Sequence, residues 1–304
     1  MILLGWLAVR FGIVEKDMMD KVGKVCFTYF LSSRVFLELY NSEASFSEGV
    51  PMLEYLTVAT LVSFVITWIL AAKLIKDKNS VGAFVQGTFR SSFTVLGLSM
   101  VGNLAGDEGI AYSASVLMMT VILYNTMAVI CLTKPNEGTG DKAQGFWSKA
   151  GHLIKDILTN PLIIGVILAL LTRAMGIKLP YIADKTISYL SDMAIPLSLI
   201  TIGASLDLDR IKGRIGLAFL AAFIKTFGLA MVAIPVAVFL GFRQLDLAII
   251  TIVFTTGNPS ASYVMTKSMN GDSELSATAL VLSTLLSVFS LTLGLYILRS
   301  LGLI

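Results

Sequence analysis

The chain has 304 residues, of which 56% are hydrophobic and 14% are charged, and its mean hydropathy is +0.82. Soluble globular domains carry about 25% charged residues, so this composition excludes an ordinary soluble globule and indicates a helical membrane bundle. The formal net charge of +3 is not informative as a total, and we expect no nucleic-acid partner. The two cysteines fall in or beside apolar segments, which argues against a disulfide framework or a zinc site.

Apolar segments close to the ~20 residues that a bilayer core requires predict a first set of five helices. They lie near 1–12, 22–40, 51–75, 81–105 and 110–132. The first segment is too short to span a bilayer, and it lacks the basic leader and small-residue cleavage site of a signal peptide. We therefore expect a truncated first helix.

A polar stretch at 134–156, with glycine, proline and many charges, separates this set from a second one. The second set is predicted near 157–176, 181–206, 213–240, 245–270 and 274–299. The chain is thus divided into a first five-helix repeat (1–133), a linker and a second repeat (157–304). An odd number of spans turns the second half upside down relative to the first. The prediction is an all-α membrane protein with ten transmembrane helices as two inverted repeats.

An internal repeat supports this organisation. Sliding the sequence on itself by about 165 positions superimposes the fourth and ninth predicted helices and the segments that follow them. The aligned pairs include Phe89 with Phe254, Met100 with Met265, Gly106 with Gly271 and Ala114 with Ala279. Both helices are interrupted by small, polar or helix-breaking residues. A bilayer cannot satisfy loose backbone groups, so broken spans at matching positions point to the binding site of a transporter.

The basic residues predict how the chain is oriented. Lysine and arginine concentrate in alternate loops, with the densest cluster at Arg210, Lys212 and Arg214, and the central linker belongs to the basic set. Cytoplasmic loops hold the excess of basic residues. We therefore expect a multi-pass protein of the cell membrane with a cytoplasmic linker and both termini outside. The loop that carries Arg173 and Lys178 departs from this pattern.

The ninth predicted helix contains the triplet Gly257-Asn258-Pro259. Proline removes a backbone donor and displaces the preceding residue from helical geometry, while glycine lets the chain turn. We expect the helix to unwind here and to restart at Ser260, with free N–H groups and a positive dipole end that suit a carboxylate. Asn258 and Ser260 would add side-chain donors. The alternative is a kink whose hydrogen bonds are restored by neighbouring helices.

The fourth predicted helix holds the counterpart, Arg90-Ser91-Ser92-Phe93-Thr94. Its last three residues align with the Gly-Asn-Pro triplet, but the segment has no proline. Serine and threonine can also bond back to carbonyls of their own helix, so an unbroken helix is the alternative. The repeat favours a second break, and we assign Ser92, Phe93 and Thr94 to the substrate site together with the triplet and Ser260.

Three basic residues are candidates for charge compensation or coupling: Lys225, Arg34 and Arg90. A charge at the depth of Lys225 costs roughly 2.5–3.5 kcal/mol on insertion scales, so it should face the bundle interior. There it would neutralise an anionic substrate or carry a proton, snorkelling being the alternative. Arg34 stays charged and would be a structural cation or a gate. We expect no acidic residue at comparable depth, which argues against a carboxylate-based sodium site or proton relay.

Two further polar or helix-breaking positions are secondary candidates. Asn125 lies inside the fifth predicted helix, where a buried amide most often bridges helices. Pro196 should kink the seventh, and the small residues after it favour close helix packing over contact with a ligand. No metal site is predicted.

Several segments, in order and spacing, resemble the bacterial branch of the auxin efflux carrier family of membrane transport proteins. They include Asn160-Pro161, Ile195-Pro196, Lys225, Gly257-Asn258-Pro259 and, in the first half, Phe89-Arg90-Ser91-Ser92-Phe93. The resemblance covers almost the whole chain. It implies a ten-helix inverted-repeat fold related to the bile-acid/sodium symporters, in which helices four and nine cross at broken segments and one helix set moves against a scaffold.

The resemblance also implies export or exchange of organic anions, with Ser92, Thr94 and Asn258 as the polar residues of the crossing. This chain departs from the family in having Ser32-Ser33 where a proline is common, with Arg34 beside them. Its fourth-helix segment is also free of proline.

The sequence therefore predicts a secondary transporter of a small organic anion such as a carboxylate, working by alternating access where helices four and nine cross. A sodium-coupled symporter on the same fold is the nearest alternative, and proton coupling is the other open possibility. A passive channel and an intramembrane enzyme are the remaining rivals. No HExxH, paired-aspartate or Ser–His motif is present, so we expect no enzyme and no cofactor. The expected partners are the anion and the lipid bilayer, and a homodimer is compatible with such a carrier.

Overall fold

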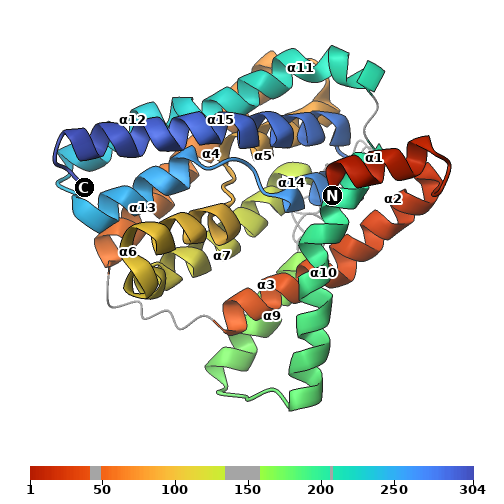
Figure 1. The fold of residues 1–304 in the computed structure, drawn as a ribbon, viewed down its shortest axis with the longest axis horizontal. Helices are drawn as coiled ribbons and strands as arrows, with labels where there is room; N and C mark the ends of the chain where they lie inside the picture. Colours follow the sequence, from red (N-terminus) through yellow and green to blue (C-terminus); the bar gives the residue numbers. More distant parts are fainter. Residues whose placement is uncertain (42–48, 134–157, 206–207) are drawn as a thin grey trace, which may run out of the picture.

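The computed structural model describes residues 1–41, 49–133, 158–205 and 208–304, and every regular element in these ranges is a helix (Figure 1). The predicted linker, 134–156, lies outside the described residues. Three elements labelled η are short stretches of π-helix, a wider helical turn that is frequent at functional sites.

The first half follows the predicted segments closely. Its elements are α1 (Ile2–Arg10), α2 (Lys16–Val25), η1 (Cys26–Leu31), α3 (Ser32–Tyr40), α4 (Val50–Leu74), α5 (Lys78–Phe89), η2 (Phe93–Gly97), α6 (Leu98–Tyr112) and α7 (Ala114–Leu132). The prediction placed a connecting segment between helices at 105–110, but the structure shows helix there, interrupted at a single residue. Gly106 takes a left-handed φ of 62°, so the chain changes direction at one residue and α6 resumes at once to Tyr112.

The second half contains the remaining helices. They are α9 (Pro161–Ala174), α10 (Tyr181–Ser205), α11 (Leu208–Phe223), η3 (Ile224–Gly228), α12 (Leu229–Phe239), α13 (Gln244–Thr255), α14 (Ser260–Ser268) and α15 (Ser273–Ser300). Local chemistry sets several of these boundaries. Asn160 caps α9, its side-chain oxygen accepting from Leu162 N at 3.0 Å, with Pro161 at the first helical position.

Five helical stretches of the described residues are long and apolar enough to cross a membrane: 50–74, 114–132, 181–204, 214–239 and 273–300. A sixth span results if α13 and α14, which are bent by 44° at their break, are counted as one. The described chain is therefore a multi-pass helical membrane protein. The count of ten spans stays a prediction, since α9 has only 14 residues and α5 ends at a break.

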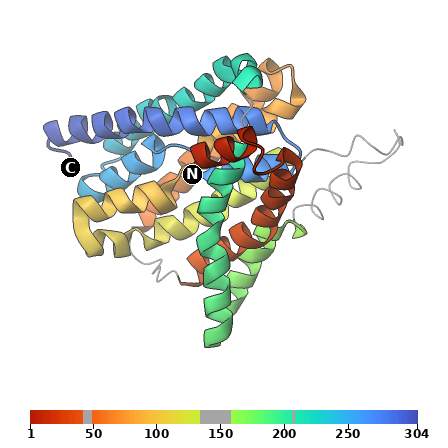
Figure 2. The ribbon, with the colours of Figure 1, turned by 45° about the vertical axis from the view of Figure 1, so that its right-hand side comes forward.

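The helices pack as two groups (Figure 1 and Figure 2). The first, which we call the α10 group, consists of α1, α2, η1, α3, α9 and α10, and α10 contacts α1, α2, η1 and α3. The second, the α15 group, consists of α4, α5, α6, η2, α11, η3, α12, α13 and α15, with α15 packed on α5, α11 and α13. Two helices, α7 and α14, contact both groups.

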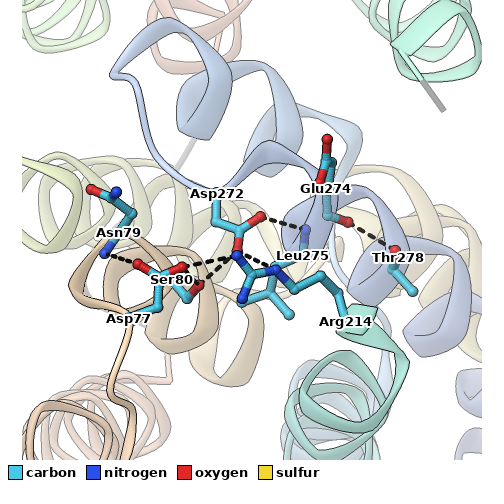
Figure 3. Close-up of polar contacts among 8 residues, drawn as sticks. All are labelled: Asp77, Asn79, Ser80, Arg214, Asp272, Glu274, Leu275 and Thr278. Atoms are coloured by element: carbon cyan, nitrogen blue, oxygen red, sulfur yellow. Dashed lines mark hydrogen bonds and ion pairs between the residues drawn. The ribbon is translucent and has the colours of Figure 1, made fainter. Parts of the chain in front are cut away.

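A polar cluster joins the starts of α5 and α15 to α11 in the α15 group (Figure 3). Asp77 Oδ1 accepts from Asn79 N and caps α5, and Asp272 Oδ1 accepts from Leu275 N and caps α15, both at 3.0 Å. Arg214 of α11 joins the two caps, with Nη2 2.8 Å from Asp77 Oδ2 and Nε 3.1 Å from Asp272 Oδ2. The hydrogen bond from Arg214 holds the pKa of Asp77 below its usual value. The cluster sets the relative register of α5, α11 and α15.

Candidate functional site

Both predicted helix breaks are present. The first, at 90–92, separates α5 from η2, and Arg90 there is extended with φ −74° and ψ 136°. The second, at 256–259, separates α13 from α14, and Thr256 and Pro259 are extended with ψ of 144° and 153°. The first break forms without a proline.

The two breaks touch each other. Ser92 N donates to Gly257 O at 2.9 Å, and the hydroxyls of Ser91 and Thr256, 165 positions apart, lie 2.6 Å from each other. Each contact joins two positions that the internal repeat aligns. Two equivalent positions of a repeat can contact each other only where both lie close to the axis that relates the two copies. This is the arrangement expected of two related halves that cross at their breaks.

The carbonyl groups that α13 leaves free at its end are satisfied by side chains of other helices. Lys225 Nζ of η3 donates to Val253 O at 3.0 Å and to Phe254 O at 3.3 Å, and Ser290 Oγ of α15 donates to Thr255 O at 3.1 Å. Lys225 is fully buried. A cation at this position complements the negative end of the helix dipole. The structure therefore places Lys225 as a cap on the broken helix.

A cavity of about 300 Å³ lies beside the crossing, between α3, α7, α10 and the two breaks. Of the residues predicted for the site, its lining contains Arg34, Arg90, Ser92, Thr94, Asn125, Asn258, Pro259 and Ser260. Four others, Phe93, Gly257, Lys225 and Pro196, are not part of the lining. The structure thus brings residues of both breaks and of α3, α7, α9, α10 and α15 to one place.

The residues outside the lining serve the packing around it. Phe93 is fully buried in the core of the α15 group. A Cβ at Gly257 would come within 2.8 Å of the Ser283 carbonyl, so glycine allows α15 to approach the break. Pro196 lies within α10, and its neighbour Ile195 is the residue that reaches the cavity.

The cavity contains an acidic residue that the residue pattern did not indicate. Glu38 lines it, and its Oε1 lies 2.8 Å from Arg34 Nε. No acidic residue was expected beside the basic ones, but Glu38 lines the same cavity as Arg34 and Arg90. Glu38 stands near the end of its predicted helix, a position typical of an interfacial residue. Residues four apart on a helix share a face, and that spacing from Arg34 was the available signal.

The guanidinium of Arg90 is held from two sides. Its Nη2 donates to Asn125 Oδ1 at 2.7 Å, while Asn125 Nδ2 donates to Val121 O and so fixes the amide. Nη1 lies 2.7 Å from Met265 Sδ. When the Gln86 amide is assigned in the orientation that satisfies its neighbours, its oxygen accepts from the same Nη1 at 2.9 Å. Arg90 is only 5% exposed. Its positive charge is thus held by neutral partners at the edge of the cavity.

Asn258 links the second break to its surroundings. Its backbone N–H donates to Ser283 Oγ at 3.0 Å, and Nδ2 donates to Gly87 O of α5 at 2.9 Å. Its Oδ1 is buried and has no partner among the described residues. The expected side-chain donor is thus partly engaged by α5. The atom of Asn258 without a partner among the described residues is therefore a hydrogen-bond acceptor, Oδ1, and not a donor.

The first turn of α14 supplies further donors. Ser260 lines the cavity together with Ala261, and its hydroxyl accepts from Ser198 Oγ of α10 at 2.9 Å. The backbone N–H groups of Ser260 and Ala261 make no hydrogen bond to the described residues. Such groups at a helix start suit an anion.

Chemically, the cavity suits a small anion with an apolar part. Two guanidinium groups and one carboxylate leave it with a single net positive charge, and apolar side chains such as Leu31, Val35 and Leu162 complete its lining. The described residues contain no group of three or more His, Cys, Asp or Glu side chains that could hold a metal ion.

Broken helices that enclose a charged cavity inside a multi-pass bundle are typical of membrane transporters. The family model for membrane transport proteins matches residues 1–295, and the chain belongs to this family, that of the auxin efflux carriers. An uncharacterized transporter of Methanothermobacter thermautotrophicus is 19% identical over 294 residues, covering 96% of this chain and 93% of the relative. One of Methanocaldococcus jannaschii is 20% identical over 304 residues, covering 96% and 94%. The chain is thus a membrane transport protein.

Proposed function

We propose that the protein is a secondary transporter that carries a small organic anion, such as a carboxylate, by alternating access at the crossing of its two breaks. The observation that carries this proposal is the cavity itself. It adjoins two contacting breaks, and its lining of described residues contains two cations, the buried Arg90 and the partly buried Arg34, beside one carboxylate, Glu38. Charges at this depth in a membrane protein mark the path of a substrate or ion.

The position of the cavity between the two helix groups supports alternating access. Arg34 belongs to the α10 group, whereas Arg90 and Ser92 follow α5 of the α15 group. A displacement of one group relative to the other would separate the two cations and open the cavity. An ion pair between Lys267 of α14, which contacts both groups, and Asp20 of α2 ties α14 to the α10 group. A substrate that binds both cations would stabilise the closed arrangement.

Uptake into proteoliposomes tests the proposal. Purified protein would be assayed with radiolabelled acetate, benzoate and malonate, and we expect saturable transport of at least one of them. Arg90→Gln should reduce it by about tenfold or more, because a hydrogen bond between charged groups contributes about 1.5–3 kcal/mol. The matched control is Arg299→Gln, at an exposed position in the last turn of α15. Equal activity of the Arg90 variant and the wild type would contradict the site assignment.

Sodium coupling is the second candidate, and a specific observation favours it. Asn258 Oδ1 and Ser262 Oγ are both buried without a partner among the described residues, and neutral oxygens of this kind can coordinate a hard cation. Replacing sodium by choline at constant pH separates the candidates. Loss of transport in choline indicates a symporter, and unchanged transport indicates a carrier that does not use sodium.

We also propose that the linker is cytoplasmic and that both termini face outward in the cell membrane. The basic loops before α2 and α5 support this orientation, since they would lie on the same side as the linker. A periplasm-active reporter fused after Ile304 should be active, and one inserted at 140 should be inactive. The opposite pattern would reverse the orientation without affecting the proposed transport activity.

A further inference from the structure

Glu38 is the feature of the cavity that anion binding alone leaves unexplained. A site for an anion has no evident use for a carboxylate, because like charges repel in a medium of low dielectric constant. Yet Glu38 lines the cavity one helical turn from Arg34, on the same face of α3. A role for Glu38 in accommodating the substrate rests on the proposed function, the transport of an anion.

The contact between Glu38 and Arg34 is close but imperfect. Arg34 Nε lies 2.8 Å from Glu38 Oε1, yet this buried oxygen accepts no well-aligned hydrogen bond from the described residues. The two side chains are 24% and 17% exposed, and both line the cavity. Arg90, by contrast, is held by well-directed bonds to neutral amides. Of the two cations, Arg34 is therefore the one whose partner is more easily exchanged.

Few other charges surround Glu38. The breaks contribute Arg90, and α7 contributes the titratable Tyr124 with the neutral Asn125. The helices α9 and α10, which pack against α3, contribute to the lining only the apolar side chains Leu162, Ile195 and Leu199. Among the described residues, Arg34 and Arg90 are thus the only cations in the lining, and a substrate carboxylate must share them with Glu38.

We propose that Glu38 is a resident counter-anion that the substrate displaces, and that it takes up one proton as the substrate binds. The substrate carboxylate replaces Glu38 at Arg34. A proton from water then binds a carboxylate oxygen of Glu38, and it returns to water when the substrate leaves. For a monoanion such as acetate or benzoate, the cavity holds one net positive charge before and after this exchange, because the proton offsets the charge of the anion. A buried site avoids the cost of changing its charge. Anion and proton therefore bind together.

Calorimetry measures the proton directly. Acetate, benzoate and malonate would be titrated into the purified protein at about pH 7 in phosphate and in Tris, whose ionisation enthalpies differ. The difference in heat gives the protons taken up per anion bound. For the wild type we expect up to one proton, and a dissociation constant that rises by as much as about tenfold per pH unit between about pH 6 and 8, because one proton is linked to binding.

Glu38→Gln removes the titrating group and keeps the shape. This variant should bind the anion without proton uptake and with an affinity that changes less than about twofold across the same pH range. Glu38→Asp, which keeps a carboxylate, should take up a proton on anion binding as the wild type does. Glu54→Gln, an exposed carboxylate on α4, is the matched control and should behave as the wild type does.

The outcomes are distinct. Binding with no proton uptake by the wild type, or with equal uptake by Glu38→Gln, overturns the inference and leaves the proposed function intact. If no carboxylate binds the wild type, both fail. Should Glu38→Gln not fold, Glu38→Asp and the proton count of the wild type still decide, since the inference requires coupling in both.

Discussion

The two breaks have the same position in the repeat but are stabilised in different ways. The second, at 256–259, contains a glycine and a proline, and its free carbonyls are satisfied by Lys225 and Ser290 from neighbouring helices. The first, at 90–92, has no helix breaker of its own. It is held by groups of the second break: Gly257 O accepts from Ser92 N, and the Asn258 amide donates to Gly87 O. One break is thus encoded locally, and the other depends on tertiary contacts.

The breaks also differ in where they place their positive charge. Arg90 of the first break faces the cavity, where an anion can reach it. The cation that serves the second break, Lys225, lies behind it and caps α13. The cavity thus draws its charge from Arg90 and Arg34, whereas the second break contributes a helix start and the Asn258 amide. Four experiments test this contrast between the breaks.

Replacing Lys225 by Met should have the largest effect. The substitution leaves two buried carbonyls at the end of α13 without partners, and an unsatisfied buried group costs about 1–3 kcal/mol. We expect the stability of the detergent-solubilised protein to fall by about 3 kcal/mol, measured by thermal unfolding. Lys73→Met, at an exposed position on α4, is the control. If the Lys225 variant keeps its stability but loses anion binding, Lys225 is a ligand and not a cap.

Substitutions at Gly257 and Pro259 distinguish two requirements of the second break: space for close packing at Gly257 and the backbone restriction of proline at Pro259. Gly257→Ala places a Cβ 2.8 Å from the Ser283 carbonyl and should cost about 1–3 kcal/mol, as overpacking does. Pro259→Ala should change stability by less, about 1 kcal/mol, because tertiary contacts keep even the proline-free break open. Gly216→Ala, where nothing lies within 4 Å, controls for the added methyl group. A larger effect of Pro259→Ala would show that proline itself holds this break open.

The contact between the breaks can be measured with a double-mutant cycle. Ser91→Ala and Thr256→Val each remove one hydroxyl of the 2.6 Å pair. We expect a coupling free energy of about 0.5–1.5 kcal/mol in thermal or denaturant unfolding, the usual net contribution of a hydrogen bond. A coupling near zero would mean that the two breaks are independent, which would contradict the dependence of the first break on the second.

The smallest effect should come from the cluster that anchors α5 before the first break. The pKa of Asp77 is lowered by its hydrogen bond to Arg214, so its contribution to stability is present above about pH 4, the ordinary pKa of aspartate, and is lost as the pH falls through the lowered value. Melting temperatures of the wild type and Asp77→Asn should therefore converge as the pH is lowered below about 4. A difference that stays constant with pH would rule out this ionic contribution.

The residue pattern identified much of the candidate site. Gly257-Asn258-Pro259 predicted a break because its chemistry acts on the adjacent backbone, and Arg34, Arg90 and Asn125 were noticed because polar groups are rare in apolar spans. Glu38 was missed for the opposite reason: near the end of a helix a carboxylate is ordinary. Lys225 was correctly expected to be buried, but its partners are carbonyls 28 and 29 residues away, which no local pattern indicates.

The order of residues was enough to establish the helices, the membrane environment, the family and the proline-containing break, because each depends on local propensity or on transfer of side chains out of water. Three outcomes came from the packed bundle instead: the first break stays open against Gly257, Lys225 caps a helix, and Glu38 shares a cavity with Arg34 and Arg90. These outcomes depend on contacts between helices that are far apart in the sequence, and the local propensities of single segments do not determine those contacts.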